Sequence, residues 1–146
     1  KSLVQTYNSG DFAGLLAGGD VDIAHGYNGQ IAMVVAENPD KLAYVMPKEG
    51  GTIWMDSLCI PIKARNVEAA HLFMDFILEP EISAEIVNAM HYASANGAAK
   101  PHINPAILND PAIYPADATV AHCEFIEDIG DAVTAMDKYW TEIKAQ

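Results

Sequence analysis

Residues 48–61 read Lys-Glu-Gly-Gly-Thr-Ile-Trp-Met-Asp-Ser-Leu-Cys-Ile-Pro, and the fold of the chain is organised around this stretch. A Gly-Gly turn leads into a run of aliphatic and β-prone residues that ends at a proline, which is typical of a buried strand. We therefore predict a mixed α/β protein with a central buried strand between Gly51 and Pro61.

One acidic residue interrupts this apolar run. Asp56 lies two positions after Trp54, so the two-residue period of a strand places both side chains on one face. A carboxylate beside an indole ring can bind an organic ammonium, because the acid supplies the countercharge and the ring supplies a cation–π surface. The alternative is that a nearby Lys, Arg or set of backbone N–H groups neutralises the acid, and the sequence leaves both open.

The composition restricts the class of protein. The chain has 146 residues, enough for one domain with a sizeable core, and no apolar run reaches the roughly 18 residues of a membrane span. A formal net charge of −12 disfavours binding to nucleic acid or anionic membranes and attracts cations, although an acidic surface also serves solubility alone. The chain begins without a start methionine or a leader, so we expect it to be part of a longer protein.

Local patterns before the central stretch predict further strands and helices. Short strands are expected over 3–7, 21–26 and 42–46. Ser9 or Asp11 can cap a helix that ends at Leu16, and Asn28 can cap a helix over 30–37.

The part of the chain after the central stretch is predicted to be mainly helical. Asn66 caps a helix with apolar residues at helical spacing, and Pro80 ends this helix and begins the next. Residues 92–99 show neither period and are expected to form a loop that passes into a short helix. A last helix is expected over about 124–144. Its apolar stripe is predicted to pack on a sheet and consists of Phe125, Ile129, Val133, Met136, Trp140 and Ile143.

Several templates for catalysis and metal binding are not met. The five histidines show no HExxH, HxH or Cys/His ligand spacing, so no metal site is predicted. Ser57 and Ser94 lie in no GxSxG motif, and the Gly-Gly pairs match neither a P-loop nor a dinucleotide-binding fingerprint. The sequence therefore predicts neither an enzyme nor a bound cofactor.

Three aromatic residues remain as candidates for a binding site. Tyr27, Trp54 and Tyr92 lie with Asp56 at predicted strand ends or in loops, where α/β proteins bind ligands. Each ring, taken alone, is more often part of a core. Together with the acid they form a candidate site for a small cation.

The same residues carry a resemblance to a known family. Residues 47–51, followed by 54–58 (Trp-Met-Asp-Ser-Leu) and Ile60-Pro61, resemble the middle of spermidine/putrescine-binding proteins, the solute receptors of polyamine ABC importers. Further segments resemble that family in the same order, namely 26–29 (Gly-Tyr-Asn-Gly), 76–82 (Phe-Ile-Leu-Glu-Pro-Glu-Ile), 92–99 and Tyr114-Pro115. The resemblance covers this whole chain but less than half of a family member.

The resemblance implies roles for five residues. By it, Trp54 stacks on the aliphatic chain of a polyamine, Asp56 pairs with an ammonium group and Tyr92 lines the cleft. Tyr27 stands where the family has a tryptophan, which keeps an aromatic wall but shortens it. Gln30 stands at a position that is acidic in putrescine binders and small in spermidine binders, and we expect spermidine to be favoured over putrescine.

The resemblance also implies the fold and the cellular role. The fold is a portion of a two-lobed type II periplasmic binding protein, with residues 1–54 in the second lobe, 55–102 in the first lobe after a hinge crossing, and 103–146 back in the second lobe with the C-terminal helix. The role is capture of a polyamine for the permease of an ABC importer, in the periplasm or as a lipid-anchored protein on the outer face of a Gram-positive cell.

Two alternative functions stay open. One is a receptor for another small organic cation or solute. The other is an enzyme or a regulatory domain on the same fold, which a nucleophile–base pair or a fused DNA-binding segment would mark, and neither is visible in the sequence.

Two further expectations concern the chain itself. By the resemblance Cys59 and Cys123 lie in different lobes, and they are predicted to be unpaired because a bridge between lobes would oppose closure. The isolated chain is expected to self-associate, because missing neighbours would leave apolar surface and strand edges open.

Overall fold

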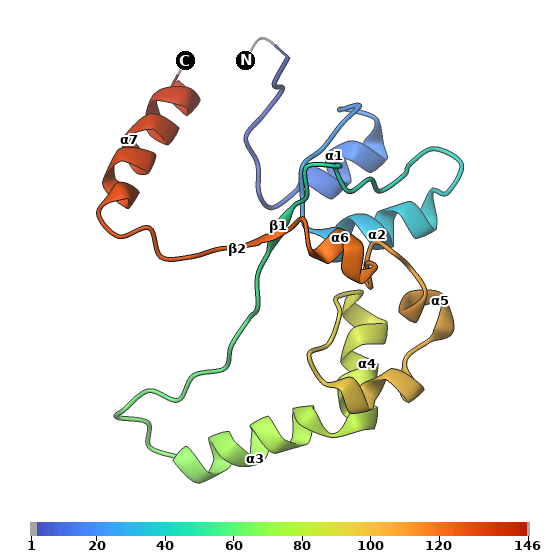
Figure 1. Ribbon diagram of the computed structural model, residues 1–146, viewed down its shortest axis with the longest axis vertical. Helices are drawn as coiled ribbons and strands as arrows, with labels where there is room; N and C mark the ends of the chain where they lie inside the picture. The colour runs from blue at the N-terminus through green and yellow to red at the C-terminus, as the bar shows by residue number, and fades with distance from the viewer. Residues whose placement is uncertain (1–2, 146) are drawn as a thin grey trace.

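The computed structural model describes residues 3–145, which form short helices joined by long extended segments (Figure 1). In chain order the elements are α1 (Phe12–Gly18), α2 (Asn28–Glu37), β1 (Thr52–Ile53), α3 (Val67–Leu78), α4 (Pro80–Met90), the 3₁₀ helix η1 (Gly97–His102), α5 (Pro105–Leu108), α6 (Asp117–Val120), β2 (Glu124–Phe125) and α7 (Ala132–Ala145). This mixture of helices with a small parallel sheet agrees with the predicted α/β class, although both strands are short.

The sheet joins the central stretch to a segment near the end of the chain. β1 and β2 run parallel, with Thr52 opposite Glu124 and Ile53 opposite Phe125. The Glu124 N–H donates to the Gly51 carbonyl at 3.0 Å. The Gly-Gly turn is needed here, because Gly50 has a φ of 97° and a Cβ on it would overlap the His122 carbonyl.

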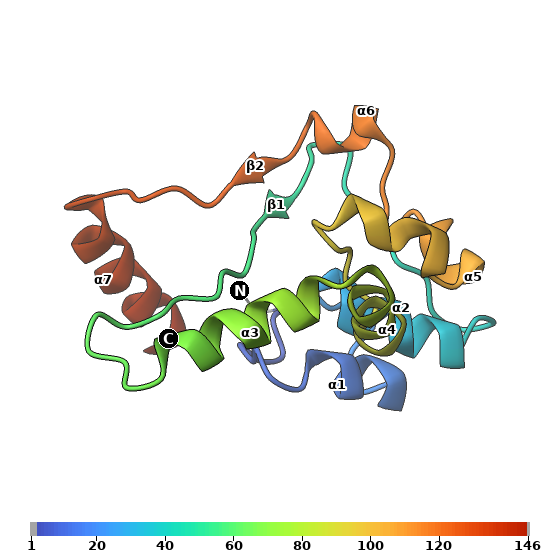
Figure 2. The ribbon, with the colours of Figure 1, turned by 90° about the horizontal axis from the view of Figure 1, so that it is seen from below.

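The core lies among the helices. Its buried residues come from α2, α4, η1, α5 and the segments that follow η1 and α5, and they are Ala32, Ala84, Val87, Ala99, Ile103, Ile107, Ala112 and Ile113. α4 buries a narrow face of small residues against η1, so the two helices pack closely. Figures 1 and 2 both show α2, α4 and α5 side by side, and this group supports the segments that carry the candidate site residues.

The helices predicted from local signals are confirmed. α1 begins after Asp11, whose side chain makes no capping hydrogen bond, and ends at Gly18, two residues beyond the predicted Leu16. Gly19 follows with a φ of 79°, which suits glycine. α3 follows Asn66, whose side chain makes no capping hydrogen bond, so the predicted capping role is not seen. α3 ends at Leu78, and Pro80 begins α4, as proline in the first helical turn predicts. The capping role predicted for Asn28 is wrong, because Asn28 is the first residue of α2 and its side chain donates to the Ala112 carbonyl instead.

Several predicted strands do not form. Residues 3–7, 21–26 and 42–46 are extended or turn-like but pair with no strand among the described residues. The central strand ends at Ile53, and residues 54–60 are mostly exposed rather than buried. A strand needs a hydrogen-bonded neighbour, and the one neighbour that the described chain supplies is β2.

The predicted last helix is shorter than expected. Residues 124 and 125 form β2 instead of helix, and α7 begins only at Ala132, after Gly130 with its φ of 55°. The stripe on α7 docks on no sheet in the described chain, and the Trp140 ring is instead met edge-on by Tyr7, with 5.1 Å between ring centroids. Hydrophobic spacing marked the helix, but it did not identify the surface the helix packs on.

Two other expectations concern chemistry at the scale of the whole chain. Cys59 and Cys123 are both free, as predicted. No helix in the described part of the chain has the length and apolar character needed to cross a bilayer.

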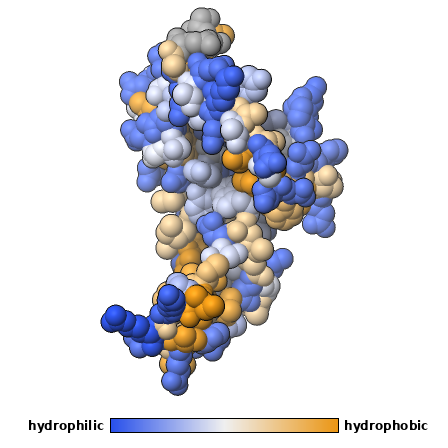
Figure 3. Space-filling model, turned by 90° about the vertical axis from the view of Figure 1, so that its left-hand side faces the viewer, coloured by the Kyte–Doolittle hydropathy of each residue, from blue (hydrophilic) through white to orange (hydrophobic). Residues whose placement is uncertain are grey.

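Much apolar surface is left uncovered. The accessible surface is 11353 Å², whereas a compact protein of this mass has roughly 7300 Å². α3 buries none of its residues, and Leu72, Phe73 and Phe76 are each at least half exposed. Figure 3 shows hydrophobic side chains gathered at the lower end of the molecule, where Figure 1 places α3. A surface of this kind favours association.

We expect the isolated 146-residue chain to self-associate, as measured by size-exclusion chromatography with light scattering. The pair of substitutions Phe73→Gln and Phe76→Gln should shift the chain towards the monomer, because it removes apolar area from α3. The matched pair Glu68→Gln and Asp75→Asn changes the same helix without removing apolar area and should leave the association unchanged. A parent chain that elutes as a monomer at all concentrations would contradict the expectation.

Candidate functional site

Three aromatic rings predicted as site residues form one row. Tyr27 precedes α2, Trp54 follows β1 and Tyr92 follows α4, so the row is assembled from three separate segments. The Tyr27 and Trp54 ring centroids are 5.3 Å apart at 65°, and those of Trp54 and Tyr92 are 6.2 Å apart at 74°. These are edge-to-face contacts, an arrangement that pairs of aromatic rings prefer. Tyr27 is 46% exposed and Trp54 is 37% exposed, so both rings still present surface to a ligand.

The other two predicted residues lie at the Tyr92 end of the row. Burial raises the pKa of the Tyr92 phenol, and the negative charge of the nearby Asp56 raises it further. A hydrogen bond from the Gln30 backbone lowers the pKa of the same phenol. The structure therefore places Tyr92 near both the backbone of the first turn of α2 and the acid, in the same region as the other two rings.

Asp56 keeps its side chain in an open position. It lies just beyond the end of β1 in an exposed segment, where Figure 1 shows the chain leaving the sheet without regular structure. The ion pair found among residues 3–145 is the exposed pair Lys48–Glu49, with 3.9 Å between Nζ and Oε1, and it does not involve Asp56. The carboxylate is thus presented beside the aromatic row rather than paired with a described Lys or Arg.

Polar contacts hold the start of α2 and the Tyr92 loop in place. The Asn28 amide donates to the Ala112 carbonyl at 2.7 Å and ties the start of α2 to the core segment. Two residues after Tyr92, the Ser94 hydroxyl lies 3.0 Å from that of the buried Ser83, and the Ser94 N–H donates to the Tyr114 hydroxyl at 3.2 Å. These contacts fix the segments that carry Tyr27 and Tyr92 on the same group of helices.

The row of rings extends to a residue that the sequence does not single out. Phe12 of α1 is only 5% exposed, and its ring centroid lies 6.0 Å from that of Tyr27 at 60°. In the sequence Phe12 is one more apolar residue of a short helix, and only the distance to Tyr27 relates it to the site. Its burial makes it a support beneath Tyr27 rather than a contact for a ligand.

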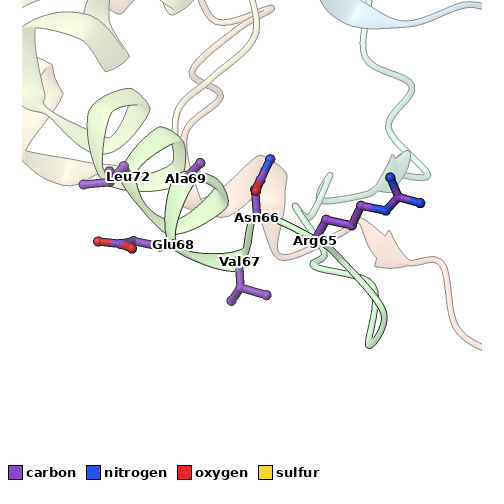
Figure 4. Close-up of a pocket in the computed structure, with 6 residues that line it drawn as sticks. All are labelled: Arg65, Asn66, Val67, Glu68, Ala69 and Leu72. Atoms are coloured by element: carbon purple, nitrogen blue, oxygen red, sulfur yellow. The ribbon is translucent and has the colours of Figure 1, made fainter.

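Two surface hollows lie away from these rings. One of about 360 Å³ surrounds the first turn of α3, and its lining residues all come from 65–72. Figure 4 shows the side chains of Arg65 and Glu68 pointing in opposite directions there, so no group of side chains converges. The second, of about 280 Å³, lies between α1 and the segment after α2. Neither hollow is lined by an aromatic ring.

The arrangement is suited to binding rather than catalysis. Flat, half-exposed rings next to a carboxylate can hold a cation with apolar parts, because the rings cover methylene groups and the acid supplies the countercharge. Within residues 3–145 no group of three or more His, Cys, Asp or Glu side chains is placed to hold a metal ion.

Comparison with known proteins gives a family. Residues 1–116 match the model of the family described as bacterial extracellular solute-binding protein. A spermidine/putrescine-binding periplasmic protein of Salmonella typhimurium is 35% identical over 97% of this chain and 40% of its own length. A putrescine-binding periplasmic protein of Pseudomonas aeruginosa is 34% identical over 99% of this chain and 41% of its own. The chain thus spans about two fifths of the length of these curated relatives.

The position of Asp56 can be tested through the phenol of Tyr92. Asp56→Asn should lower the pKa of Tyr92, because it removes the negative charge that disfavours the phenolate. The measurement is an NMR titration of tyrosines labelled with ¹³C at Cζ. Tyr44, whose pKa is also raised by burial, is the internal control and should not change. An unchanged Tyr92 pKa in the variant would show that the acid lies elsewhere in solution.

Proposed function

The chain belongs to the family of bacterial extracellular solute-binding proteins, and we propose that within the full-length protein it captures a polyamine for an ABC importer. The observation that supports this proposal is the row of Tyr27, Trp54 and Tyr92 with Asp56 at its end. The family is one of binding proteins, which agrees with the prediction that the chain is not an enzyme. The names of its relatives supply the ligand class, spermidine and putrescine.

The chemistry of a polyamine matches this row. A polyamine alternates ammonium groups with short methylene chains, so it needs carboxylates for its charges and apolar faces for its methylenes. Trp54 offers the largest face, and Tyr27 continues the wall at an angle of 65° to it. Asp56 then serves as the acceptor for one ammonium group, while the other ammonium groups are bound by residues of the full-length protein outside this chain.

We propose that this chain contributes to both lobes of a type II periplasmic binding protein. In this proposal residues 1–54 and 103–146 belong to one lobe and 55–102 to the other. The parallel pairing of β1 with β2 is compatible with it, because both strands then belong to the lobe formed by 1–54 and 103–146. In the described chain α2 and α4 share one core. In this proposal the aromatic row lies where the two lobes meet, because Tyr27 belongs to one lobe and Tyr92 to the other.

The proposed location follows from the relatives. They are named as periplasmic proteins, so we propose the periplasm, or the outer surface with a lipid anchor in a Gram-positive cell. The proposed protein partner is the permease of the importer. A negative net charge of −12 is compatible with a cationic ligand and disfavours a nucleic-acid partner.

The first test of this function is a thermal-shift panel of polyamines on the full-length protein, because a ligand that binds only the folded form raises its melting temperature. Asp56→Asn should then weaken the binding of spermidine by roughly tenfold or more, as measured by calorimetry, because an ammonium group loses its countercharge. Glu49→Gln removes an exposed acid from the same stretch of sequence and should leave the affinity unchanged. Equal affinities of parent and Asp56→Asn would refute the role of the acid.

The second test concerns the choice of ligand. We expect spermidine to be bound more tightly than putrescine, because the neutral Gln30 amide accepts a hydrogen bond but supplies no charge to the second end of a diamine. Gln30→Asp should narrow the gap between the two ligands, whereas Gln30→Asn, which keeps the amide, should not. The measurement is competition calorimetry on the full-length protein, and tighter binding of putrescine by the parent would overturn the preference.

A further inference from the structure

A buried glycine lies beneath the Tyr92 ring. Gly29 is in the first turn of α2, one residue before Gln30, and it is buried. A Cβ on Gly29 would lie 2.7 Å from both Cε2 and Cζ of Tyr92, a distance that real Cβ atoms do not adopt. The ring of Tyr92 therefore rests directly on the backbone of α2, which is why its phenol reaches the Gln30 backbone.

The opposite end of the row is fitted in the same way. Phe12 packs beneath Tyr27, and the residue before Tyr27 is Gly26. A Cβ on Gly26 would overlap the Phe12 ring. Each end of the row thus combines an aromatic ring with a glycine that leaves room for it, and the two glycines flank Tyr27 and Asn28 in the sequence.

We propose that Phe12 and Gly29 are positioning residues, which fix the angles of the Tyr27, Trp54 and Tyr92 rings before a ligand arrives. Phe12 packs against the Tyr27 ring, and Gly29 leaves room for the Tyr92 ring on α2. Trp54 contacts both tyrosines and lies between them. Rings that are already in place lose little freedom when a ligand binds, so presetting raises affinity without any added contact. This consequence for affinity rests on the proposed polyamine function, but the presetting of the rings does not.

A purely local role for Gly29 gives the opposite expectation. Gly29 has no positive φ, and alanine is the better helix former, so Gly29→Ala would stabilise an isolated α2. Under the proposal the same substitution pushes the Tyr92 ring off the helix, because packed rings cannot absorb an overlap of this size by small shifts. Whether Gly29→Ala stabilises the protein or displaces the Tyr92 ring therefore separates a positioning role from helix propensity.

The experiment uses ¹⁹F NMR of the full-length protein labelled with 5-fluorotryptophan, without ligand. The Trp54 resonance is assigned by its loss in Trp54→Phe. The variants are Gly29→Ala and Phe12→Leu, and each is checked for cooperative thermal unfolding. The matched control is Gly97→Ala at the start of η1, where an added Cβ meets no atom within 4 Å.

We expect both variants to shift or broaden the ligand-free Trp54 resonance and the control to leave it in place. Spermidine affinity should fall about tenfold in the variants and stay unchanged in the control, because the rings must then be ordered on binding. A Trp54 resonance that matches the parent in Gly29→Ala and in Phe12→Leu overturns the proposal. If Gly29→Ala does not fold, Phe12→Leu decides by the same criterion. If the parent binds no polyamine, the proposed function fails, while the ligand-free spectra still decide the positioning role.

Discussion

The pairing of residues 51–53 with 124–126 is the constraint on which the candidate site depends. Beyond Ile53 the chain has no regular structure and is mostly exposed, so nothing in the local backbone fixes Trp54 or Asp56. The short parallel ladder sets the point and the direction in which the chain leaves the sheet, and Gly50 permits the close approach to His122 that the ladder requires. Two aromatic contacts then hold Trp54 from either side.

Local signals predicted the helices well, whereas partners distant in the sequence decided the strands. The boundary between α3 and α4 follows from Pro80 alone, because proline lacks an N–H and favours the first helical turn. A strand depends on a second segment, and residues 21–26 and 42–46 have a strand-like composition without a partner in the described chain. Residues 124–125 likewise form β2 rather than the start of the predicted last helix, because they pair with β1.

The chemistry of the sequence singles out the candidate site residues, but it does not single out the residues that support them. Tyr27, Trp54 and Tyr92 stand out because aromatic rings and an acid in loops suit an organic cation, and the family resemblance singled out the same positions. Gly29 and Phe12 carry no such signal, because a glycine in a helix and a phenylalanine in a short amphipathic helix are common. Their relation to the rings arises from packing between segments far apart in the chain, which periodicity does not report.

Charge acts on this site at two ranges. At the ionic strength of the cell the field of an exposed charge is screened within about 8 Å, so most acids on this chain act on a cation only as part of a general attraction that speeds its approach. That attraction does not distinguish one polyamine from another. Discrimination requires groups in contact with the ligand, and the candidates in this chain are Asp56, Gln30 and the three rings of the row. In the proposed function a polyamine meets a single acid and an aromatic wall in this chain. A preference among polyamines then depends on Gln30 and on where the full-length protein places its next acceptor.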